Sequence, residues 1–368
     1  MGKLQKVIAA LESKGSTIGG LKALTGFDGY VDHLAKVVNH RRDSRTYTLF
    51  QDIREFAQHL YAAAGKSCDL ELLPQSIKLG GNAPIMANAL GCLGVDTVCI
   101  GALGEREIAP PFREMSPNCR LISIGEPSQT TALEFGDGKV MLADSSVLAN
   151  INWECLKDKV GVETLRKLIG SANLVALVNW SLLDNVETIW WGILEEVLPG
   201  GAVPEYVFFD LADPAKRSSQ AVRDVVQLMG AYSAYTHTIL GLNENEAERV
   251  YAALYGDAPQ GMVLGEICLK IREAAGIDTV VIHPLTFSVA VGPQGTAEEQ
   301  GFFVPQPKIS TGGGDNFNAG FCLGMMLGLN LDECLVLAMG VSSFYVRHGF
   351  SPTVDCVISC LRELMKGT

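Results

Sequence analysis

The sequence predicts an α/β fold, in which a sheet lies between two layers of helices and a small accessory sheet forms a lid. From about residue 79 onward, apolar strands, Gly-rich turns and helical stretches alternate, which is typical of a sheet with helices on both faces. Two segments richer in polar and β-branched residues interrupt this alternation. The chain contains no internal repeat and no linker-like stretch, so residues 1–368 are expected to form one domain with a lid.

The predicted strands of the main sheet are short and apolar throughout. Both faces of each strand are therefore expected to be buried. These strands cover residues 97–103, 174–179, 206–211, 238–242, 279–283 and 287–291. Helices are predicted from apolar periodicity and start signals. They cover residues 84–93, 185–197, 244–254, 265–275, 316–327 and 331–346.

The two interrupting segments cover residues 30–49 and 119–143, and both are expected to supply strands of the lid. The second segment contains Asp137-Gly138 between residues suited to strands. Asp-Gly is typical of a tight hairpin turn, because the second residue of such a turn needs a positive φ that glycine adopts without strain. A β hairpin is therefore predicted around these two residues.

Composition and charge argue against several classes of protein. The chain is 48% hydrophobic and 19% charged, which indicates a compact core rather than disorder. Its net charge of −12 is spread along the chain, which argues against nucleic acid or an anionic membrane as a partner. The ten cysteines form no CxxC pair and several lie in apolar runs, which indicates buried thiols rather than zinc ligands or disulfides. With no signal-peptide core and no run of about 20 apolar residues, the protein is expected in the cytoplasm.

The strongest functional signal is the segment Ser310-Thr311-Gly312-Gly313-Gly314-Asp315, directly before a predicted helix. Three consecutive glycines expose backbone N–H groups, and a helix N-terminus adds a positive dipole, so the segment suits an anion such as a phosphate. Beside a transferring phosphoryl group, Asp315 could accept the proton of an attacking hydroxyl. The alternative is that Asp315 only caps the helix after a flexible turn.

This segment closely resembles the C-terminal signature of the ribokinase, or PfkB, carbohydrate kinase family, which usually reads Asp-Thr-x-Gly-Ala-Gly-Asp. Residues 78–94, which begin Lys-Leu-Gly-Gly-Asn-Ala-Pro, look like the N-terminal Gly-Gly signature of the family and its helix. Residues 243–246, Asn-Glu-Asn-Glu, resemble the Asn-x-x-Glu motif of the family. A weaker resemblance links residues 210–217 to an Asp-x-Asn-x-Arg stretch near the phosphates. The resemblance extends from Gly26 to Thr353.

The resemblance implies an ATP-dependent carbohydrate kinase with a ribokinase-like three-layer α/β/α fold and a β lid. It gives Asp315 the role of catalytic base and forms an anion hole from Gly312, Gly313 and Gly314. The residues that it places on the sugar side are Asp28, Asp32, Gly80, Gly81 and Asn82. The residues that it places around the nucleotide are Asn243, Thr311 and Asn318, and Glu246 would act on the metal side. The implied partners are ATP, Mg²⁺ and a sugar-like molecule.

Several positions depart from the family pattern. Ile309 stands where the signature begins with Asp, and Ile85 stands near a position where a substrate-contacting Asn is common. These changes leave two alternatives open: a nucleoside or vitamin-precursor kinase of the same fold, and a ligand sensor that has lost activity. The loop at 283–286 lacks a glycine common in the family, so the need for a monovalent cation is open too. A homodimer through the lid is also open, because apolar lid residues such as Val31 could pair with a partner or cover the sugar.

Overall fold

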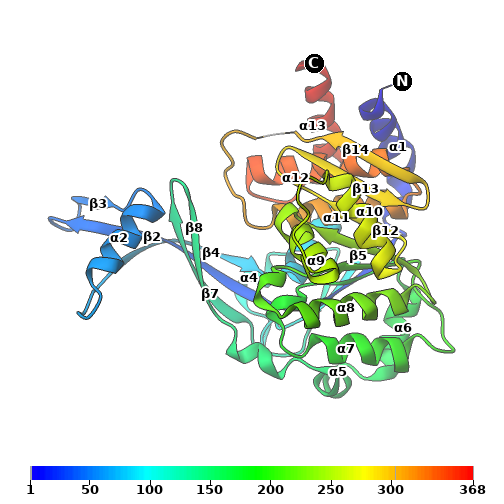
Figure 1. Ribbon diagram of the computed structural model, residues 1–368, viewed down its shortest axis with the longest axis horizontal. Coiled ribbons are helices and arrows are strands. Elements are labelled where there is room, and N and C mark those ends of the chain that lie inside the picture. The colour runs from blue at the N-terminus through cyan, green and yellow to red at the C-terminus, as the bar shows by residue number, and fades with distance from the viewer. Residues whose placement is uncertain (1, 303, 368) are drawn as a thin grey trace.

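The computed structural model describes residues 2–302 and 304–367. Within these residues a nine-stranded sheet lies between two layers of helices, and a five-stranded sheet projects to one side of this body (Figure 1). Apolar side chains fill the space on both faces of the larger sheet. The predicted fold class, a three-layer α/β/α sandwich with a small β lid, is confirmed.

The main sheet is parallel except at one edge. Its strands are β1 (Lys22–Phe27), β5 (Asp96–Gly101), β6 (Cys119–Ser123), β9 (Leu174–Leu177), β10 (Tyr206–Asp210), β11 (His237–Leu242), β12 (Thr279–Ile282), β13 (Phe287–Gly292) and β14 (Gly295–Gln300). Their order is β14-β13-β12-β11-β10-β9-β1-β5-β6, and β13 pairs antiparallel with both β12 and β14. Every residue of β9 and β12 is buried, as expected for strands covered on both faces.

Each face of the main sheet carries its own helix layer and its own apolar core. One layer consists of α1 (Lys3–Ile18), α3 (Asn82–Cys92), α11 (Gly313–Met326), α12 (Leu331–His348) and α13 (Val354–Gly367). The other consists of α5 (Trp153–Lys159), α6 (Val162–Ser171), α7 (Val186–Gly192), α8 (Ser219–Tyr232), α9 (Glu244–Tyr255) and α10 (Leu264–Ala275). The short α4 (Pro110–Arg113) adds Phe112 to a smaller cluster. Among the described residues, none of the helices has both the length and the apolar character to cross a membrane.

The lid consists of five strands and one helix. These are β2 (Tyr30–Arg41), β3 (Tyr47–Leu49), β4 (Glu71–Gly80), β7 (Ser128–Phe135), β8 (Gly138–Asp144) and α2 (Ile53–Ala62). The lid has its own small core, in which Phe56 of α2 packs with Val37 and Leu133 of the strands. Figure 1 shows this unit extending away from the sandwich.

Two details of the lid differ from the prediction. Residues 119–123 form β6 at the edge of the main sheet, so their assignment to the lid was wrong. The half-exposed pattern of this edge strand resembles that of a lid strand, which explains the error. The predicted hairpin is present as β7–β8, but Phe135 pairs with Gly138, so the turn residues are Gly136 and Asp137. The sequence analysis also missed β4 and α2.

The chain order of the main sheet reverses around β1, which lies between β9 and β5. Ligands of open α/β sheets bind at the carboxyl ends of the strands beside such a reversal. Polar residues follow several of these ends, among them Asp28 after β1 and Asn243 after β11. The non-glycine residues Asn179 and Ala212 adopt positive φ angles of 61° and 52° after β9 and β10. Strained backbone of this kind clusters at functional sites, which indicates a site at this edge of the sheet.

Candidate active site

The glycine loop before α11 is fixed by contacts from α12. Gly312 adopts φ 87° and ψ 0°, and a Cβ atom at this position would lie 2.8 Å from the Tyr345 hydroxyl oxygen. That hydroxyl donates a hydrogen bond to the Thr311 carbonyl oxygen at 2.9 Å, and the Ser342 hydroxyl donates to the Gly313 carbonyl oxygen at 2.9 Å. The loop therefore requires glycine at 312 and presents the start of α11 in one orientation.

An α-helix leaves the N–H groups of its first turn without helical acceptors, which makes its N-terminus a favourable place for an anion. Here the Gly313 N–H group is an exception, because it donates to the Ser310 carbonyl oxygen at 3.2 Å. Gly314 belongs to the same turn and lines a cavity. Gly313 thus shapes the turn, and the anion hole at 312–314 stays a prediction.

Asp315 lies in the first turn of α11 and is 8% exposed. Burial raises the pKa of its carboxyl group well above the ordinary value, and the negative charges of Asp210, Asp28 and Glu246 raise it further. A hydrogen bond with the Asn82 side chain acts in the opposite direction. A carboxylate that binds a proton more tightly than usual is suited to act as a general base.

Asp28 lies behind the start of α3. It is fully buried, and its carboxylate accepts hydrogen bonds from the backbone N–H groups of Asn82 and Ala83, both at 2.8 Å, and from the Asn179 side chain at 2.5 Å. Burial raises its pKa to about 6, although these three donors favour the charged form. Asp28 therefore positions the start of α3, and its predicted contact with a sugar stays a prediction.

Between the lid and the glycine loop lies a small cavity of about 30 Å³, the acceptor cavity. Its lining includes Asp32 and Lys78 from the lid, Ile85 from α3, Thr311 from the loop and Tyr345 from α12. Burial raises the pKa of Asp32, which is 7% exposed. Two lid strands and two body helices thus meet around one predicted sugar-side residue.

Gly80 and Gly81, directly before α3, leave room for the carboxylates of two aspartates. A Cβ atom at Gly80 would lie 2.5 Å from the Asp32 carboxylate, and one at Gly81 would lie 2.9 Å from the Asp28 carboxylate. Gly81 also has a φ of 95°, which side chains rarely adopt. The predicted sugar-side glycines therefore make room for carboxylates.

A second group of acids lies on the other side of Asp315. Burial raises the pKa of Asp210 at the end of β10 to about 6, and burial together with the Asp210 charge raises the pKa of Glu246 to about 9. Glu246 and Asn243 form a reciprocal cap on α9, with Oε2 of Glu246 accepting the Asn243 N–H at 2.8 Å. Asn318 is 1% exposed and donates to Asp210 at 2.9 Å. Asn318 therefore positions Asp210, and its predicted contact with the nucleotide stays a prediction.

These acids fit a hydrated magnesium ion better than a metal bound by protein ligands alone. Across the described residues, His, Cys, Asp and Glu side chains form no group of three or more that could hold a metal ion directly. Mg²⁺ usually keeps several waters and uses one or two carboxylates together with substrate phosphates. Asp210 and Glu246 repel each other, and the buried Asn318 Oδ1 atom has no protein partner. A cation near this group would relieve both conditions.

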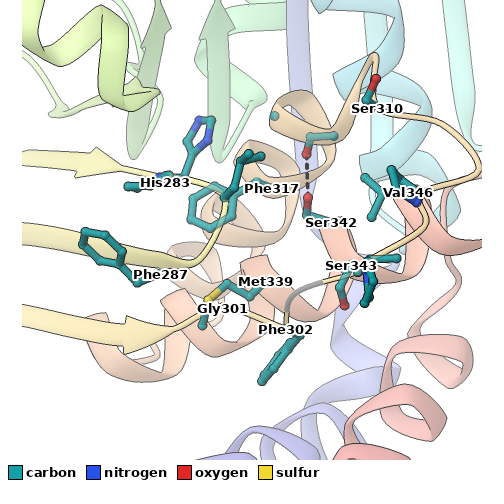
Figure 2. A pocket seen from close by; sticks show the side chains of 17 residues that line it. His283, Phe287, Gly301, Phe302, Ser310, Phe317, Met339, Ser342, Ser343 and Val346 are labelled. Carbon is teal, nitrogen blue, oxygen red and sulfur yellow. Dashed lines mark hydrogen bonds between the residues drawn. The ribbon is translucent and has the colours of Figure 1, made fainter. Parts of the chain in front are cut away.

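A larger cavity of about 410 Å³, the nucleotide cavity, lies on the other side of the glycine loop. Figure 2 shows Phe287, Phe317, Met339 and Val346 around it, and Gly313 and Gly314 complete its wall. The His283 ring lies 4.7 Å from the Phe317 ring, and burial lowers the pKa of His283 to about 4, so this ring is neutral. An apolar, partly aromatic cavity next to a helix N-terminus suits a flat base joined to phosphates.

Comparisons with known proteins agree with this geometry. A family model described as prokaryotic ketohexokinase matches residues 3–364. The chain belongs to this family. The predicted relationship to ribokinase-type, or PfkB, kinases and the predicted enzyme class, an ATP-dependent carbohydrate kinase, are thereby confirmed.

Individual relatives of this family member support the same assignment. A ketohexokinase of Haloferax volcanii is 29% identical over 347 residues, which cover 94% of this chain and 92% of the relative. The structure of Arabidopsis thaliana ribokinase complexed with ribose and ATP has a TM-score of 0.64 at 16% identity, with 93% of this chain and 98% of that chain covered. Thermotoga maritima ribokinase has a TM-score of 0.62 at 14% identity, with 93% and 99% covered. At these identities the solved structures establish the fold.

The sequence analysis missed several residues of this site. Lys78, Lys139 and Tyr345 all line the acceptor cavity. Lys78 stands next to the Gly-Gly signature and Lys139 next to the Asp-Gly turn, but neither motif indicates that the lysine beside it faces the site. Asp210 was noticed only within a weak resemblance. Its place directly at the end of an apolar strand was the signal, because functional side chains of such sheets follow the carboxyl ends of strands.

Proposed function

We propose that this chain transfers a phosphoryl group from ATP to a hydroxyl group of a ketohexose, with Asp315 as the general base. One observation carries the proposal. The segment 310–314 forms a common wall of two cavities, because Thr311 lines the acceptor cavity while Ser310, Gly313 and Gly314 line the nucleotide cavity. Asp315 directly follows this segment in the first turn of α11, which supports placing the proton transfer there.

In this proposal the protein acts mainly through position and charge. The backbone at the start of α11 holds the transferring phosphoryl group, and Asp315 orients the hydroxyl and accepts its proton. Asn82 keeps the Asp315 carboxylate in place through a hydrogen bond. Asp210 and Glu246 would hold Mg²⁺ through water, and the ion would supply positive charge to the phosphates.

The ketohexose is proposed from the names of the family and of the Haloferax volcanii relative. The acceptor cavity is compatible with a polyol on one side, since Asp32 and Lys78 are hydrogen-bonding groups. Ile85, 7% exposed, adds an apolar side chain to the same lining.

The test is ADP release by the purified full-length chain with Mg²⁺-ATP over a panel of acceptors. The panel contains ketohexoses, aldohexoses, ribose, nucleosides and hydroxymethyl heterocycles, with product identity read by mass spectrometry. We expect ketohexoses to give the highest kcat/KM. A clear preference for a nucleoside or a heterocycle would refute the substrate class, and acceptor binding without any turnover would favour the ligand sensor. Repeating the assay with K⁺ or Na⁺ tests for a monovalent cation.

Two further expectations belong to this proposal. A homodimer through the lid is supported by exposed apolar side chains on its strands, with Ile77 of β4 59% exposed and Leu142 of β8 57% exposed. Light scattering of the wild type and of Ile77→Asp tests it, and two monomeric samples would refute it. A cytoplasmic location is supported by the ten free cysteines, and cell fractionation tests it.

A further inference from the structure

Lys139 links the lid to the glycine loop. It lies at the start of β8, and its Nζ atom donates to the Thr311 hydroxyl oxygen at 3.3 Å, across 172 residues of sequence. The same Nζ atom lies 3.3 Å from a Glu134 carboxylate oxygen, and the Lys139 side chain is 20% exposed. A long, flexible side chain is therefore held with its charge next to the residue that precedes Gly312.

Lys139 is also shared by two cavities. It lines the acceptor cavity with Asp32, and it lines an open cleft of about 680 Å³ between the lid and residues 305–310. That cleft includes Ser310, which also belongs to the wall of the nucleotide cavity. The ammonium group therefore lies where the acceptor cavity, the lid-side cleft and the glycine loop meet.

The charges around this point are unequal. The body side of the site carries Asp28, Asp210, Glu246 and Asp315, whose negative charges act on one another. A phosphoryl group in transfer adds further negative charge, which must be met by cations or by N–H groups. Mg²⁺ would act on the side of Asp210 and Glu246. The lid side offers the Lys139 ammonium group.

We propose that Lys139 is a ligand of the transferring phosphoryl group, brought by the lid to complete the anion hole at the start of α11. This inference rests on the proposed function. The acceptor cavity of about 30 Å³ has room for roughly one water, so the lid must shift to admit a sugar. In that shift the ammonium group exchanges the Thr311 hydroxyl for a phosphoryl oxygen, while Glu134 keeps the side chain extended.

A purely structural role would make different predictions. If Lys139 only fastened the lid to Thr311, its removal would loosen the lid and weaken the sugar and all nucleotides alike. If Lys139 instead binds the transferring phosphoryl group, its removal weakens binding of nucleotides with a third phosphate more than binding of ADP. Such a contact also acts more strongly on the transition state than on bound ATP, because the charge on the group is redistributed during transfer.

The experiment compares the wild type with Lys139→Met, Lys139→Arg and the control Lys36→Met. Lys36 lies on the same lid and lines the lid-side cleft but not the acceptor cavity. Calorimetry with Mg²⁺ gives the affinities for ADP and for the non-hydrolysable ATP analogue AMP-PNP, and steady-state assays give kcat and KM for the sugar. Melting temperatures confirm that each variant is folded.

For Lys139→Met we expect about tenfold weaker AMP-PNP binding, ADP binding within about twofold of the wild type, and a kcat lower by about 100-fold. Lys139→Arg should recover part of both losses, because it keeps the charge, and Lys36→Met should resemble the wild type. Equal weakening of ADP and AMP-PNP would show a lid fastener and overturn the proposal. Unchanged AMP-PNP binding with a raised KM for the sugar would make Lys139 an acceptor ligand, which also overturns it.

The two proposals can fail separately. If the wild type phosphorylates no acceptor of the panel but Lys139→Met still loses AMP-PNP binding relative to ADP, the proposed function fails and the phosphate contact stands. If the wild type phosphorylates a ketohexose and Lys139→Met matches it in kcat and in both affinities, the proposed function stands and the role of Lys139 is refuted. Should Lys139→Met not fold, Lys139→Gln gives the same comparison with a shorter polar side chain.

Discussion

Replacing Asp315 with asparagine separates a catalytic role from a structural one. The carboxyl group is 8% exposed, and its pKa is raised by burial and by the charges of Asp210, Asp28 and Glu246. Asparagine has nearly the same shape and can keep the hydrogen bond with Asn82, but it cannot accept a proton. General-base assistance is typically worth ~10²–10⁴-fold, so turnover should fall at least about 100-fold, or about 2.7 kcal/mol of barrier.

Unlike turnover, the thermal stability of Asp315→Asn should not fall. Asp315→Asn removes one negative charge from a buried group of acids, so we expect the melting temperature of the ligand-free protein to stay the same or rise. Affinity for AMP-PNP should be unchanged or tighter, because one charge that repels the phosphates is gone. Coupled ADP release, calorimetry and thermal melting measure the three quantities. Turnover within a few fold of the wild type would refute the assignment of Asp315 as the base.

Asp28→Asn is the matched control. Asp28 carries the same charge in the same group, but its carboxylate accepts three hydrogen bonds, two of them from backbone N–H groups at the start of α3. An asparagine there places an NH₂ group against a donor, which costs about 1–3 kcal/mol. Asp28→Asn should therefore lower the melting temperature, whereas Asp315→Asn should not. Equal destabilisation by both changes would mean that Asp315 is a structural helix cap.

Three further predictions concern the metal side, the glycine loop and pH. Glu246→Gln should raise the Mg²⁺ concentration for half-maximal rate about tenfold, whereas the exposed neighbour Glu244→Gln should not; equal responses in a Mg²⁺ titration would count against a metal role. Gly312→Ala should destabilise the fold by roughly 1–3 kcal/mol in chemical denaturation, because φ 87° and the 2.8 Å approach to Tyr345 both oppose a side chain. Gly328→Ala is the control and should destabilise the fold less, because φ is 67° there but the surroundings are open. Because the pKa of Glu246 is raised from 4.5 to about 9, its contribution to stability is full below pH 4.5 and is lost as pH rises toward 9. The melting temperature of the wild type should therefore decline over this range, and Glu246→Gln should flatten the decline. An equal decline in both proteins would contradict the raised pKa.

The parts of the site that could be predicted are those formed by residues that are neighbours in the sequence. The glycine loop with Asp315 and the Asn243–Glu246 cap are local, because a turn, a helix start and a reciprocal cap each need only a few neighbouring side chains. The alternation of buried strands and helices was visible for the same reason. Each of these features follows from backbone rules that act over one or two turns of helix.

The parts that could not be predicted depend on contacts between distant segments. Asp28 and Asp32 lie four residues apart on adjoining stretches of chain, yet one is sealed behind α3 and the other lines a cavity. Both carboxylates lie against Gly80 and Gly81, which are about 50 residues away in the sequence. The edge strand β6 was misplaced because its half-exposed pattern resembles that of a lid strand, and its pairing with β5 depends on the course of a connection that includes α4.

These long-range contacts place acidic side chains on the body side of the site and a lysine on the lid side. Strand ends and helix starts of the body supply Asp210, Glu246 and Asp315, which repel one another in the ligand-free protein. The lid supplies Lys139, which lies near both Asp32 and Thr311. In the proposed complex, Mg²⁺ on the side of Asp210 and Glu246 and the Lys139 ammonium group on the lid side would together offset the negative charge of the acids and of the nucleotide. Because the lid would bring Lys139 to the phosphoryl group only as it closes over an acceptor, such a site would favour transfer to the acceptor over transfer to water.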